Sequence, residues 1–375
     1  MRLKVLNITA DYPDEIQPSK TQAVKLLLEA SAHDHFIVSI NRCSNPYRER
    51  IVEFDGGLAI SYYAPPGGIG LRFCIARLTV RILKYIKIKM LSFDYIIAHK
   101  LAVEGLVVSS LANSLNVEYA VSLWGSTDKK FLSLKPELTP TYKAIYANAS
   151  LIFPASPWIR RYVEERLNEC NSSVVMLPIV TNNTSRRSPT SNEINFVTVF
   201  NLDLYKLKGL PLLLKALADY NATWTFDIYG VGSDRSIQEI KSLLVKLGMQ
   251  DRVSLKGRVD NNEITEVLSG YHSFLMPTRS ETFGMVYIEA IYSGIPILYS
   301  LNQGIDGYFD SLNVGVKVIA GKKSSILNGL INLVRKRENF VDNIARYHES
   351  GSLKLFKKDR VVKIFDNSIT LIGEV

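Results

Sequence analysis

The sequence predicts two α/β domains, each a Rossmann-like, doubly wound and mostly parallel sheet, and we expect the two to face each other across a cleft. Short apolar runs rich in β-branched and aromatic residues alternate with longer helical patterns, which is the pattern of repeated βαβ units. A polar stretch containing Pro189 interrupts this alternation near the middle of the chain. The length of 375 residues also suits about two domains of ~150 residues each.

The apolar runs give the expected order of elements. Strands are expected in the first half at 3–9, 36–41, 59–64, 95–99, 119–125, 150–156 and 174–178. Strands are expected in the second half at 194–201, 225–230, 253–258, 274–278, 296–300 and 315–320. The clearest helical patterns cover 22–32, 103–115, 208–220 and 237–248. These elements predict an N-terminal domain at 1–182, a linker at 183–193, a C-terminal domain at 194–350 and a helical tail at 351–375 that can pack back on the N-terminal domain.

The composition is that of a soluble globular protein, with 47% hydrophobic and 22% charged residues. Three cysteines without C-x-x-C spacing argue against a disulfide framework and indicate a reducing compartment. The N-terminal residues lack the apolar core of a signal peptide, and no window of ~18 uncharged apolar residues is present, so we expect a cytoplasmic protein. The five histidines lack metal-ligand spacing and no dinucleotide fingerprint follows the first strand of either half, so neither a metal nor a cofactor is expected.

The net charge of +9 is concentrated partly in the segment 71–91, which holds six basic residues and no acidic one. On a helix, Arg77, Arg81, Lys84 and Lys87 fall on one arc. The apolar surface of this helix is expected from Phe73, Ile75, Leu78, Ile82, Tyr85 and Ile86. A basic amphipathic helix can lie in an anionic membrane interface, and the equal alternative is a packing helix with a solvated basic edge. No nucleic-acid module is recognisable, so nucleic acid is not an expected partner.

Two glutamates that enclose a glycine follow the expected strand 274–278. Glu281 falls in the loop at the carboxyl end of that strand, Gly284 near the first turn of the next helix, and Glu289 about a turn and a half into it. Free amides at a helix N-terminus bind phosphate, whereas ionised carboxylates accept hydrogen bonds from sugar hydroxyls. The arrangement therefore suggests a nucleotide-sugar site, with one carboxylate for a hexose, amides for a diphosphate and the other carboxylate for a ribose.

The run TRSETFGMVYIEAIYSGIP (278–296) resembles the E-x7-E region of retaining, metal-independent glycosyltransferases of the GT-B fold, family 4. Other pieces agree in order and spacing: Lys208-Gly209 opens a helix after the first strand of the second half, YGVGSD (229–234) is similar to the family's G-x-G turn, and LKGRVD (255–260) is similar to its F-x-G-x-V segment. The resemblance covers essentially all of residues 194–320. It implies a fold of two facing domains and transfer of a hexose from a nucleotide-sugar.

The resemblance also implies roles for single residues. Glu281 would bind hydroxyls of the donor sugar, Glu289 would hold the ribose, and Lys208 would neutralise the leaving diphosphate. The remaining donor-side residues are Phe283, Gly284 and Met285 toward the sugar or diphosphate, Lys206 as a second cation, Gly230 in the G-x-G turn, and Arg258 and Val259 toward the base. The sequence departs from the family at Leu202, where an arginine is usual.

The first half resembles the family more loosely. His99 stands at the end of strand 95–99, where the family often has a histidine near the donor sugar, so the implied catalytic residues are Glu281, His99 and Lys208; a core histidine is the alternative. The segment 120–129 is similar to the family's H-G-x-D segment, with Trp124 in place of the histidine. The acceptor-side residues expected at the cleft are Ser19, Lys20, Thr21, Gly125, Ser126 and Asp128, the first three of which can instead cap a helix.

Together these features predict a retaining glycosyltransferase that moves a hexose from a UDP- or GDP-linked donor to a saccharide or lipid-linked saccharide. The acceptor would belong to a bacterial surface polysaccharide such as lipopolysaccharide O-antigen or capsule. With the basic helix, the protein is expected to be peripheral on the cytoplasmic face of the inner membrane. Two alternatives remain: a nucleotide-sugar epimerase of the same architecture, and a non-catalytic sugar-nucleotide-binding subunit of a polysaccharide assembly complex.

Overall fold

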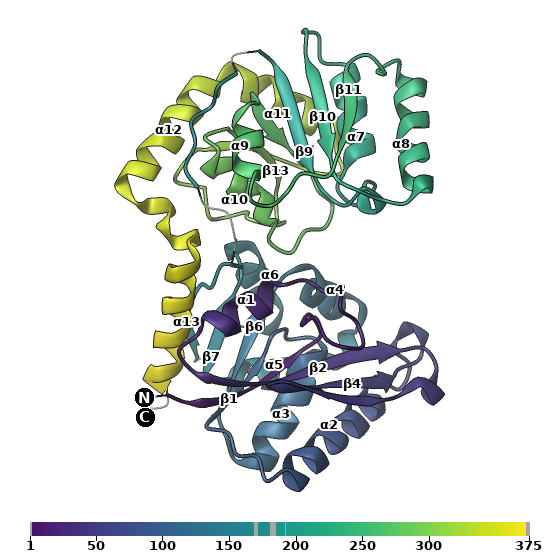
Figure 1. Cartoon of the computed structure of the whole chain (residues 1–375), viewed down its shortest axis with the longest axis vertical. Coiled ribbons are helices and arrows are strands. Elements are labelled where there is room, and N and C mark those ends of the chain that lie inside the picture. Colours follow the sequence, from purple (N-terminus) through teal and green to yellow (C-terminus); the bar gives the residue numbers. More distant parts are fainter. Residues whose placement is uncertain (1, 169–171, 181–184, 192, 373–375) are drawn as a thin grey trace. The chain divides into compact units, whose positions relative to one another are not determined.

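The computed structural model describes residues 2–168, 172–180, 185–191 and 193–372, which form two compact units (Figure 1). The first unit groups residues from 1–155, 159–180 and 358–375, and the second groups residues from 156–158 and 181–357. Each unit is built around its own sheet with helices packed on it, so the prediction of two doubly wound α/β domains is confirmed.

The sheet of the first unit has the order β3-β4-β2-β1-β5-β6-β7-β8, and all neighbours are parallel except β3 and β4. Its strands are β1 (Lys4–Thr9), β2 (Asp34–Cys43), β3 (Ile51–Phe54), β4 (Gly57–Tyr63), β5 (Tyr95–Ala98), β6 (Tyr119–Leu123), β7 (Leu151–Pro154) and β8 (Ser173–Val174). The antiparallel edge strand β3 was not expected, because its four residues are only partly buried and show no long apolar run.

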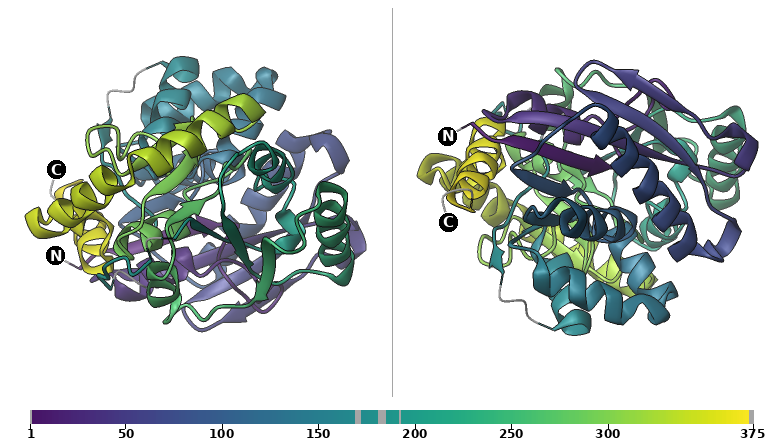
Figure 2. Two further views of the ribbon diagram at one scale, coloured as in Figure 1. Left: turned by 90° about the horizontal axis from the view of Figure 1, so that it is seen from above. Right: turned by 90° about the horizontal axis from the view of Figure 1, so that it is seen from below.

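The helices of the first unit are α1 (Ala23–Ala30), α2 (Leu71–Ile88), α3 (Val103–Leu115), α4 (Ser126–Leu134), α5 (Thr139–Asn148), α6 (Pro157–Leu167) and α13 (Lys358–Ile372). The C-terminal helix α13 lies beside α1 (Figures 1 and 2). Its Phe365 and Ile369 are buried in one apolar cluster with Val24 and Leu27 of α1. The last helix of the chain therefore belongs to the core of the first unit.

The sheet of the second unit is wholly parallel and has the order β11-β10-β9-β12-β13-β14. Its strands are β9 (Asn195–Val199), β10 (Thr225–Tyr229), β11 (Val253–Gly257), β12 (Ser273–Leu275), β13 (Ile297–Ser300) and β14 (Gly315–Val318). Its helices are α7 (Leu210–Ala218), α8 (Asp234–Leu247), α9 (Ile264–Ser269), α10 (Met285–Tyr292), α11 (Lys323–Arg335) and α12 (Arg337–Ser350). Because the chain runs outward from β9 in both directions, β9 and β12 form the topological switch point at which ligands bind in such sheets.

The domain boundaries differ from the expected ones in two places. Within the expected linker 183–193, the N–H of Arg187 donates to the Tyr292 carbonyl at 2.8 Å and that of Thr190 to the Ser269 carbonyl at 2.9 Å. These bonds attach the described linker residues to the second unit; 183, 184 and 192 lie outside the described residues. In the expected tail, residues 351–357 group with the second unit and only the residues from 358 onward group with the first.

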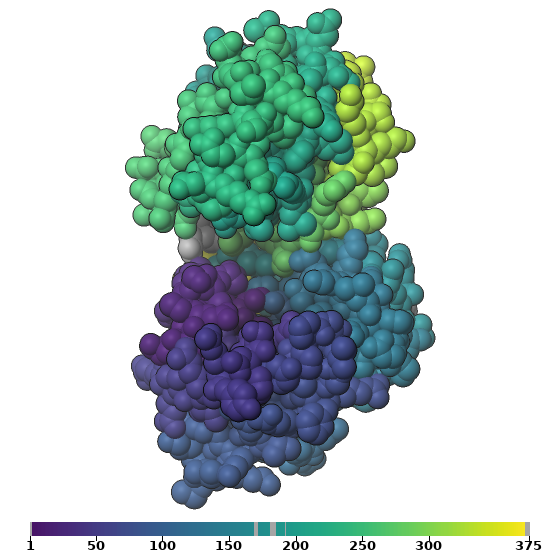
Figure 3. All heavy atoms as spheres, turned by 90° about the vertical axis from the view of Figure 1, so that its right-hand side faces the viewer, coloured from purple at the N-terminus to yellow at the C-terminus, as the bar shows by residue number. Residues whose placement is uncertain are grey.

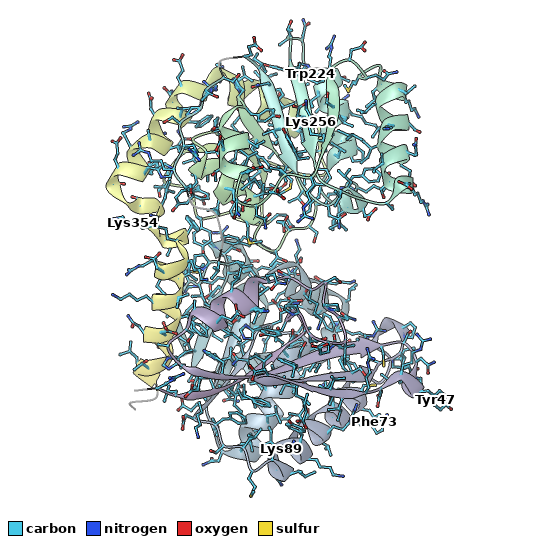
Figure 4. The ribbon with its side chains drawn as sticks, viewed as in Figure 1. Tyr47, Phe73, Lys89, Trp224, Lys256 and Lys354 are labelled. Atoms are coloured by element: carbon cyan, nitrogen blue, oxygen red, sulfur yellow. The ribbon has the colours of Figure 1, made fainter. Side chains whose placement is uncertain are left out.

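Helix α2 packs on the first unit through an apolar surface that differs from the expected one. Four of the residues assigned to that surface, Ile75, Leu78, Ile82 and Ile86, are buried in the first unit. A second group of apolar side chains on the helix, Phe73, Val80 and Ile88, is exposed instead. Figure 4 shows Phe73 projecting outward from the first unit. Within the described ranges, no helix is both long and apolar enough to cross a membrane.

Candidate active site

The switch point of the second sheet brings Lys208 and Glu281 together. Lys208 lies in the segment that follows β9, and Glu281 lies in the segment that follows the neighbouring strand β12. The Lys208 ammonium forms an ion pair with the Glu281 carboxylate, and both side chains are largely shielded from solvent. Two of the three residues to which the sequence assigned catalysis therefore meet at the position where a parallel sheet of this order binds its ligand.

Backbone contacts fix Lys208 beside the glutamate loop. The N–H of Arg279 donates to the Leu207 carbonyl at 2.8 Å, and the Thr278 hydroxyl donates to the same carbonyl at 3.2 Å. Gly209 has a φ of 81°, and a Cβ there would lie 2.1 Å from the Pro277 carbonyl oxygen. Only glycine allows this approach. The glycine after Lys208 is therefore required because the segment after β9 passes so close to the segment after β12.

The glutamate loop is held from the other side by residues that follow β13. The Gln303 side-chain oxygen accepts from the Glu281 N–H at 3.0 Å, and the Gly304 N–H donates to the Glu281 carbonyl at 3.2 Å. Neither residue was identified from the sequence. The signal available was their position, since they follow the strand next to β12 in the sheet.

Gly284 begins α10 in a conformation that favours glycine, with a φ of 78°. A Cβ at this position would lie 2.7 Å from the Tyr287 ring and 3.1 Å from Cγ of Glu281. The chain can therefore pass directly from the glutamate loop into the first turn of the helix, whose amides lack intrahelical acceptors. Next to it, Met285 is exposed, whereas the Phe283 ring is buried, 6.0 Å from the ring of Tyr308.

Glu289 is the second glutamate of the motif and the fifth residue of α10. Burial raises the pKa of its carboxyl to about 7. Among the residues that the structure describes, none hydrogen-bonds to this carboxylate or pairs with it, and only its backbone carbonyl accepts, from Ser293. A shielded acid without a protein partner carries an energetic cost, which is typical of a ligand-binding group.

Lys206 does not join Lys208. Its ammonium pairs with Glu239 of α8 at 2.9 Å and is largely exposed. Leu202, where the family has an arginine, is buried, and the Cβ of its side chain lies against the backbone of Gly232. An exposed cation that the sequence did not single out, Arg279, stands two residues before Glu281, and no described residue pairs with its guanidinium.

The remaining donor-side residues lie after the neighbouring strands. Gly230 follows β10 and donates its N–H to the Gly257 carbonyl at 2.7 Å. Arg258 follows β11 and is exposed, with its nearest acid, Asp260, at 3.9 Å. Val259 is half-buried beside it. The structure thus places all three at the carboxyl edge of the same sheet as Lys208 and Glu281.

In the first unit, the structure favours a core role for His99. The residue follows β5, is buried, and its Nε2 lies 3.1 Å from the Asn7 side-chain oxygen. Burial lowers the pKa of its imidazole to about 3, so the ring stays neutral at physiological pH. These surroundings agree with the core-histidine alternative, and the place of His99 near the donor sugar stays a prediction.

The switch point of the first sheet, between β1 and β5, carries charges that the sequence did not reveal. Lys100 pairs with Asp11 at 2.5 Å, and its ammonium lies 5.9 Å from the Trp124 ring. Glu104, in the first turn of α3, is buried and accepts from the Ala10 N–H at 3.1 Å. Burial raises the pKa of Glu104 to about 7. Each sheet therefore has a lysine–carboxylate pair at its switch point.

Asp128 was expected to line the cleft. In the structure its carboxylate instead holds two loops together. Its Oδ1 accepts from the N–H groups of Leu101 and Ala102 at 3.0 and 3.1 Å, and its Oδ2 accepts from Trp124 and Gly125 at 2.9 and 3.4 Å. The carboxylate is buried and fully used by backbone donors. Asp128 is therefore a structural group. Gly125 precedes α4, and Ser126 begins it.

The loop before α1 shows one internal ion pair. Lys20 is 3.3 Å from the buried Asp14 and donates to Ser39 at 3.1 Å. Ser19 and Thr21 are exposed, and the Thr21 hydroxyl accepts from the Ala23 N–H at 3.4 Å. This favours the helix-capping alternative for Thr21. Among the described residues there is also no cluster of three His, Cys, Asp or Glu side chains that could hold a metal ion.

Residues 181–349 match the family model of glycosyl transferases group 1. The chain is 27% identical to an uncharacterized glycosyltransferase of Methanocaldococcus jannaschii over 57% of this chain and 59% of that protein. It is 35% identical to the GtfA subunit of a peptide N-acetylglucosaminyltransferase of Streptococcus parasanguinis over 24% of this chain and 16% of that one. With the putative teichuronic acid biosynthesis glycosyltransferase TuaC of Bacillus subtilis it shares 22% identity over 82% and 83% of the two chains. The chain thus spans less than two thirds of the length of the first two of these relatives.

Solved structures with the same fold cover almost the whole chain. Sucrose-phosphate synthase of Thermosynechococcus elongatus aligns with a TM-score of 0.72 at 16% identity over 99% of this chain and 100% of that one. HepE of Anabaena in complex with UDP aligns with a TM-score of 0.71 at 12% identity, over 99% and 100%. The lipopolysaccharide outer core galactosyltransferase WaaB aligns with 0.70 at 17%, over 98% and 99%. Residues 181–349 therefore match the glycosyl transferases group 1 family, and the chain as a whole has the two-domain GT-B glycosyltransferase fold.

Proposed function

We propose that this chain is a retaining, metal-independent glycosyltransferase that uses a nucleotide-activated hexose, with UDP as the carrier. The observation that carries the proposal is the arrangement at the switch point of the second sheet. Glu281, the first turn of α10 and the unpartnered Glu289 follow one another along one loop and one helix, and Lys208 reaches Glu281 from the segment after the neighbouring strand β9. The choice of UDP is supported by the UDP bound to a protein of the same fold.

Each group has one part in binding the donor. Glu281 accepts from hydroxyls of the hexose, Glu289 accepts from those of the ribose, and the amides after Gly284 meet the diphosphate. Lys208 leaves Glu281 and pairs with the diphosphate, so that one ion pair is exchanged for another when the donor binds. Arg279 is the second cation available to the diphosphate in place of an arginine at position 202, because its exposed guanidinium has no described protein partner.

The reaction proceeds by attack of an acceptor hydroxyl on the anomeric carbon from the side of the leaving group. A new C–O bond forms to the acceptor as the bond between the anomeric carbon and the phosphate oxygen breaks. The departing nucleoside diphosphate takes the proton of the acceptor hydroxyl, so no separate base is needed. Lys208 stabilises the negative charge that develops on the diphosphate.

The acceptor is proposed to be a saccharide or lipid-linked saccharide of a bacterial surface polysaccharide. This part of the proposal is supported by the similarity to TuaC, which extends over most of both chains. An epimerase would also release the nucleotide, and a non-catalytic subunit would only bind it.

A turnover assay separates these functions. Purified protein is mixed with UDP- and GDP-hexoses, with or without a membrane extract as the source of acceptor. We expect UDP release that depends on the extract and is matched by label entering a glycosylated product. Nucleotide release accompanied only by an altered free sugar would point to the epimerase, and binding without turnover would point to the subunit.

We further propose that α2 contacts an anionic membrane surface. Lys84 and Lys87 are exposed and have no described ion-pair partner, and the exposed Phe73 and Val80 lie on the same side of the helix. Arg77 and Arg81 contribute less, because both pair with Glu49, at 2.5 and 3.2 Å. The segment from β2 to α2, dark purple to blue, forms much of the surface of the first unit in Figure 3.

The membrane proposal predicts binding to vesicles that contain phosphatidylglycerol but not to vesicles of phosphatidylcholine alone. Each basic residue near such a surface contributes about 1 kcal/mol, so Lys84→Ser with Lys87→Ser should weaken binding by roughly tenfold or more. The matched control is Lys241→Ser with Lys246→Ser on α8, which removes the same charge from the second unit. Equal loss in both double variants, measured by co-sedimentation, would show that net charge and not α2 is responsible.

A further inference from the structure

We propose that a cavity within the first unit binds the acceptor, and that this acceptor carries a phosphate group next to an apolar chain. The inference rests on the proposed function and specifies its acceptor. The cavity has a volume of about 430 Å³, within the usual range for small-molecule sites. It lies where β2 and β4 end, between the beginning of α2 and the end of α4.

The walls of this cavity are mainly apolar. Leu71 and Val103 come from the beginnings of α2 and α3, and Phe131 and Leu134 come from α4. Leu134 is 64% exposed although it is a large apolar side chain at a cavity mouth. An apolar group of a ligand would remove this side chain from water, which is favourable.

The charged residues that line the cavity are all basic: Arg42, Lys130 and Lys135. The Arg42 guanidinium also donates to the carbonyls of Ala64 and Pro65, which fixes the loop beside the cavity. Lys135 is 3.7 Å from Glu137, whereas Lys130 is exposed and has no described ion-pair partner. The excess of positive charge at an apolar cavity favours an anionic ligand, and a phosphate suits several lysine and arginine donors.

Tyr62 supplies an unused polar group at the same place. Its side chain is 6% exposed, and no described residue hydrogen-bonds to its hydroxyl. Burial raises the pKa of this phenol, so the hydroxyl stays protonated and can donate. Because Tyr62 lines the cavity, this hydroxyl is available to donate to a ligand oxygen there.

A second cavity, of about 250 Å³, gives a path for the apolar chain. It shares Tyr62 and Pro65 with the first cavity and continues past Ile69, which precedes α2, and past Phe73 of α2 to the ion pairs of Arg77 and Arg81 with Glu49. Ile69 is 75% exposed and Phe73 74% exposed. A chain that leaves the phosphate at Tyr62 can therefore run along exposed apolar side chains toward the proposed membrane-facing side of α2.

One residue of the cavity wall is next in sequence to a residue that contacts the switch point of the first sheet. Val103 lines the cavity, and the following residue, Glu104, accepts from Ala10 in the loop after β1. That loop carries Asp11, which pairs with Lys100. A saccharide attached to the phosphate would thus reach the carboxyl edge of the sheet, where ligands of open α/β sheets bind.

The test uses decyl phosphate as a soluble probe, below its micelle concentration, with inorganic phosphate and the uncharged decyl maltoside as the other arms. Binding to the full chain is measured by calorimetry. We expect decyl phosphate to bind at least tenfold more tightly than either other compound. Lys130→Ala with Lys135→Ala should weaken this binding about tenfold, and Tyr62→Phe should weaken it about threefold. Lys241→Ala with Lys246→Ala, on α8 of the second unit and outside the cavity, should leave it unchanged.

Three results would overturn the inference. If decyl maltoside binds as tightly as decyl phosphate, the cavity does not recognise a phosphate. If inorganic phosphate binds as tightly as decyl phosphate, the cavity does not recognise an apolar chain. An effect of the Lys241 and Lys246 variant as large as that of the cavity variants would show that net charge, and not the cavity, is responsible for the binding. Binding of UDP, measured on the same samples, reports on the second unit alone, so its presence separates failure of this inference from failure of the proposed function.

Discussion

Replacing Lys208 by alanine should lower kcat/KM for transfer from the nucleotide-sugar by about 10²–10³-fold, the usual effect of removing one group that stabilises charge in the transition state. Lys208 is the cation placed at the switch point of the second sheet, where it is paired with Glu281. Steady-state kinetics with varied donor concentration measures the effect. Lys206→Ala is the matched control, because this neighbouring lysine pairs with Glu239 and should change kcat/KM less than threefold.

The Lys208 variant needs a stability control because its removal leaves Glu281 shielded and unpaired. An uncompensated charge of this kind costs about 3 kcal/mol of folding stability. The double variant Lys208→Met with Glu281→Gln removes both charges and should recover most of this loss, as measured by urea unfolding. It should not recover activity. A folded Lys208→Ala protein with kcat/KM within threefold of the wild type would contradict the assigned role.

Replacing Glu289 by glutamine should have opposite effects on stability and on donor binding. The pKa of Glu289 is raised to about 7 by burial, so the folded protein resists ionising this group. Glutamine carries no charge to bury and should stabilise the ligand-free protein above pH 7 by roughly 3 kcal/mol at most. It also loses a charged acceptor for the ribose hydroxyls, so UDP should bind about 10–100-fold more weakly.

The pH dependence gives this prediction its sign. Below the ordinary pKa of a glutamate, the carboxyl is protonated in both the folded and the unfolded state, so the variant and the wild type should unfold alike at pH 4. As the pH rises toward 7, the unfolded wild type ionises while the folded one does not, and the wild type loses stability relative to the variant. Thermal unfolding at pH 4, 6 and 8 tests this. A variant that is less stable than the wild type at pH 8 would mean that the carboxylate makes a stabilising contact instead.

The succession of strands along the chain, and the loop positions that follow them, could be predicted from the sequence because apolar runs and turn residues are local signals. The strand before Glu281 and the helix that contains Glu289 follow directly from such signals. In a parallel sheet the carboxyl ends of all strands lie at one edge, so Lys208 and Glu281 could be placed at the same edge of the sheet. That they touch depends on β9 and β12 being neighbours, which only the structure shows. The edge strand β3 was missed because its four residues lack a distinct apolar pattern.

What the sequence could not supply is the partner of each polar side chain. Lys206 and Lys208 are two residues apart, and only the three-dimensional structure shows that they pair with different acids, Glu239 and Glu281. Likewise, Asp128 has a position typical of a binding residue but is used by four backbone donors. Lys100 and Asp11 form an ion pair between two loops that are far apart in the chain, so no local sequence pattern predicts it.

The measurement that tests the central claim most directly is a crystal structure of the protein with UDP-hexose bound. The account predicts that the Lys208 ammonium has moved from Glu281 to the diphosphate, that Glu281 accepts from hexose hydroxyls, and that the Glu289 carboxylate lies within hydrogen-bond distance of the ribose hydroxyls. A donor bound elsewhere on the chain, or one bound with Lys208 still paired to Glu281 and Glu289 without a ribose contact, would contradict it.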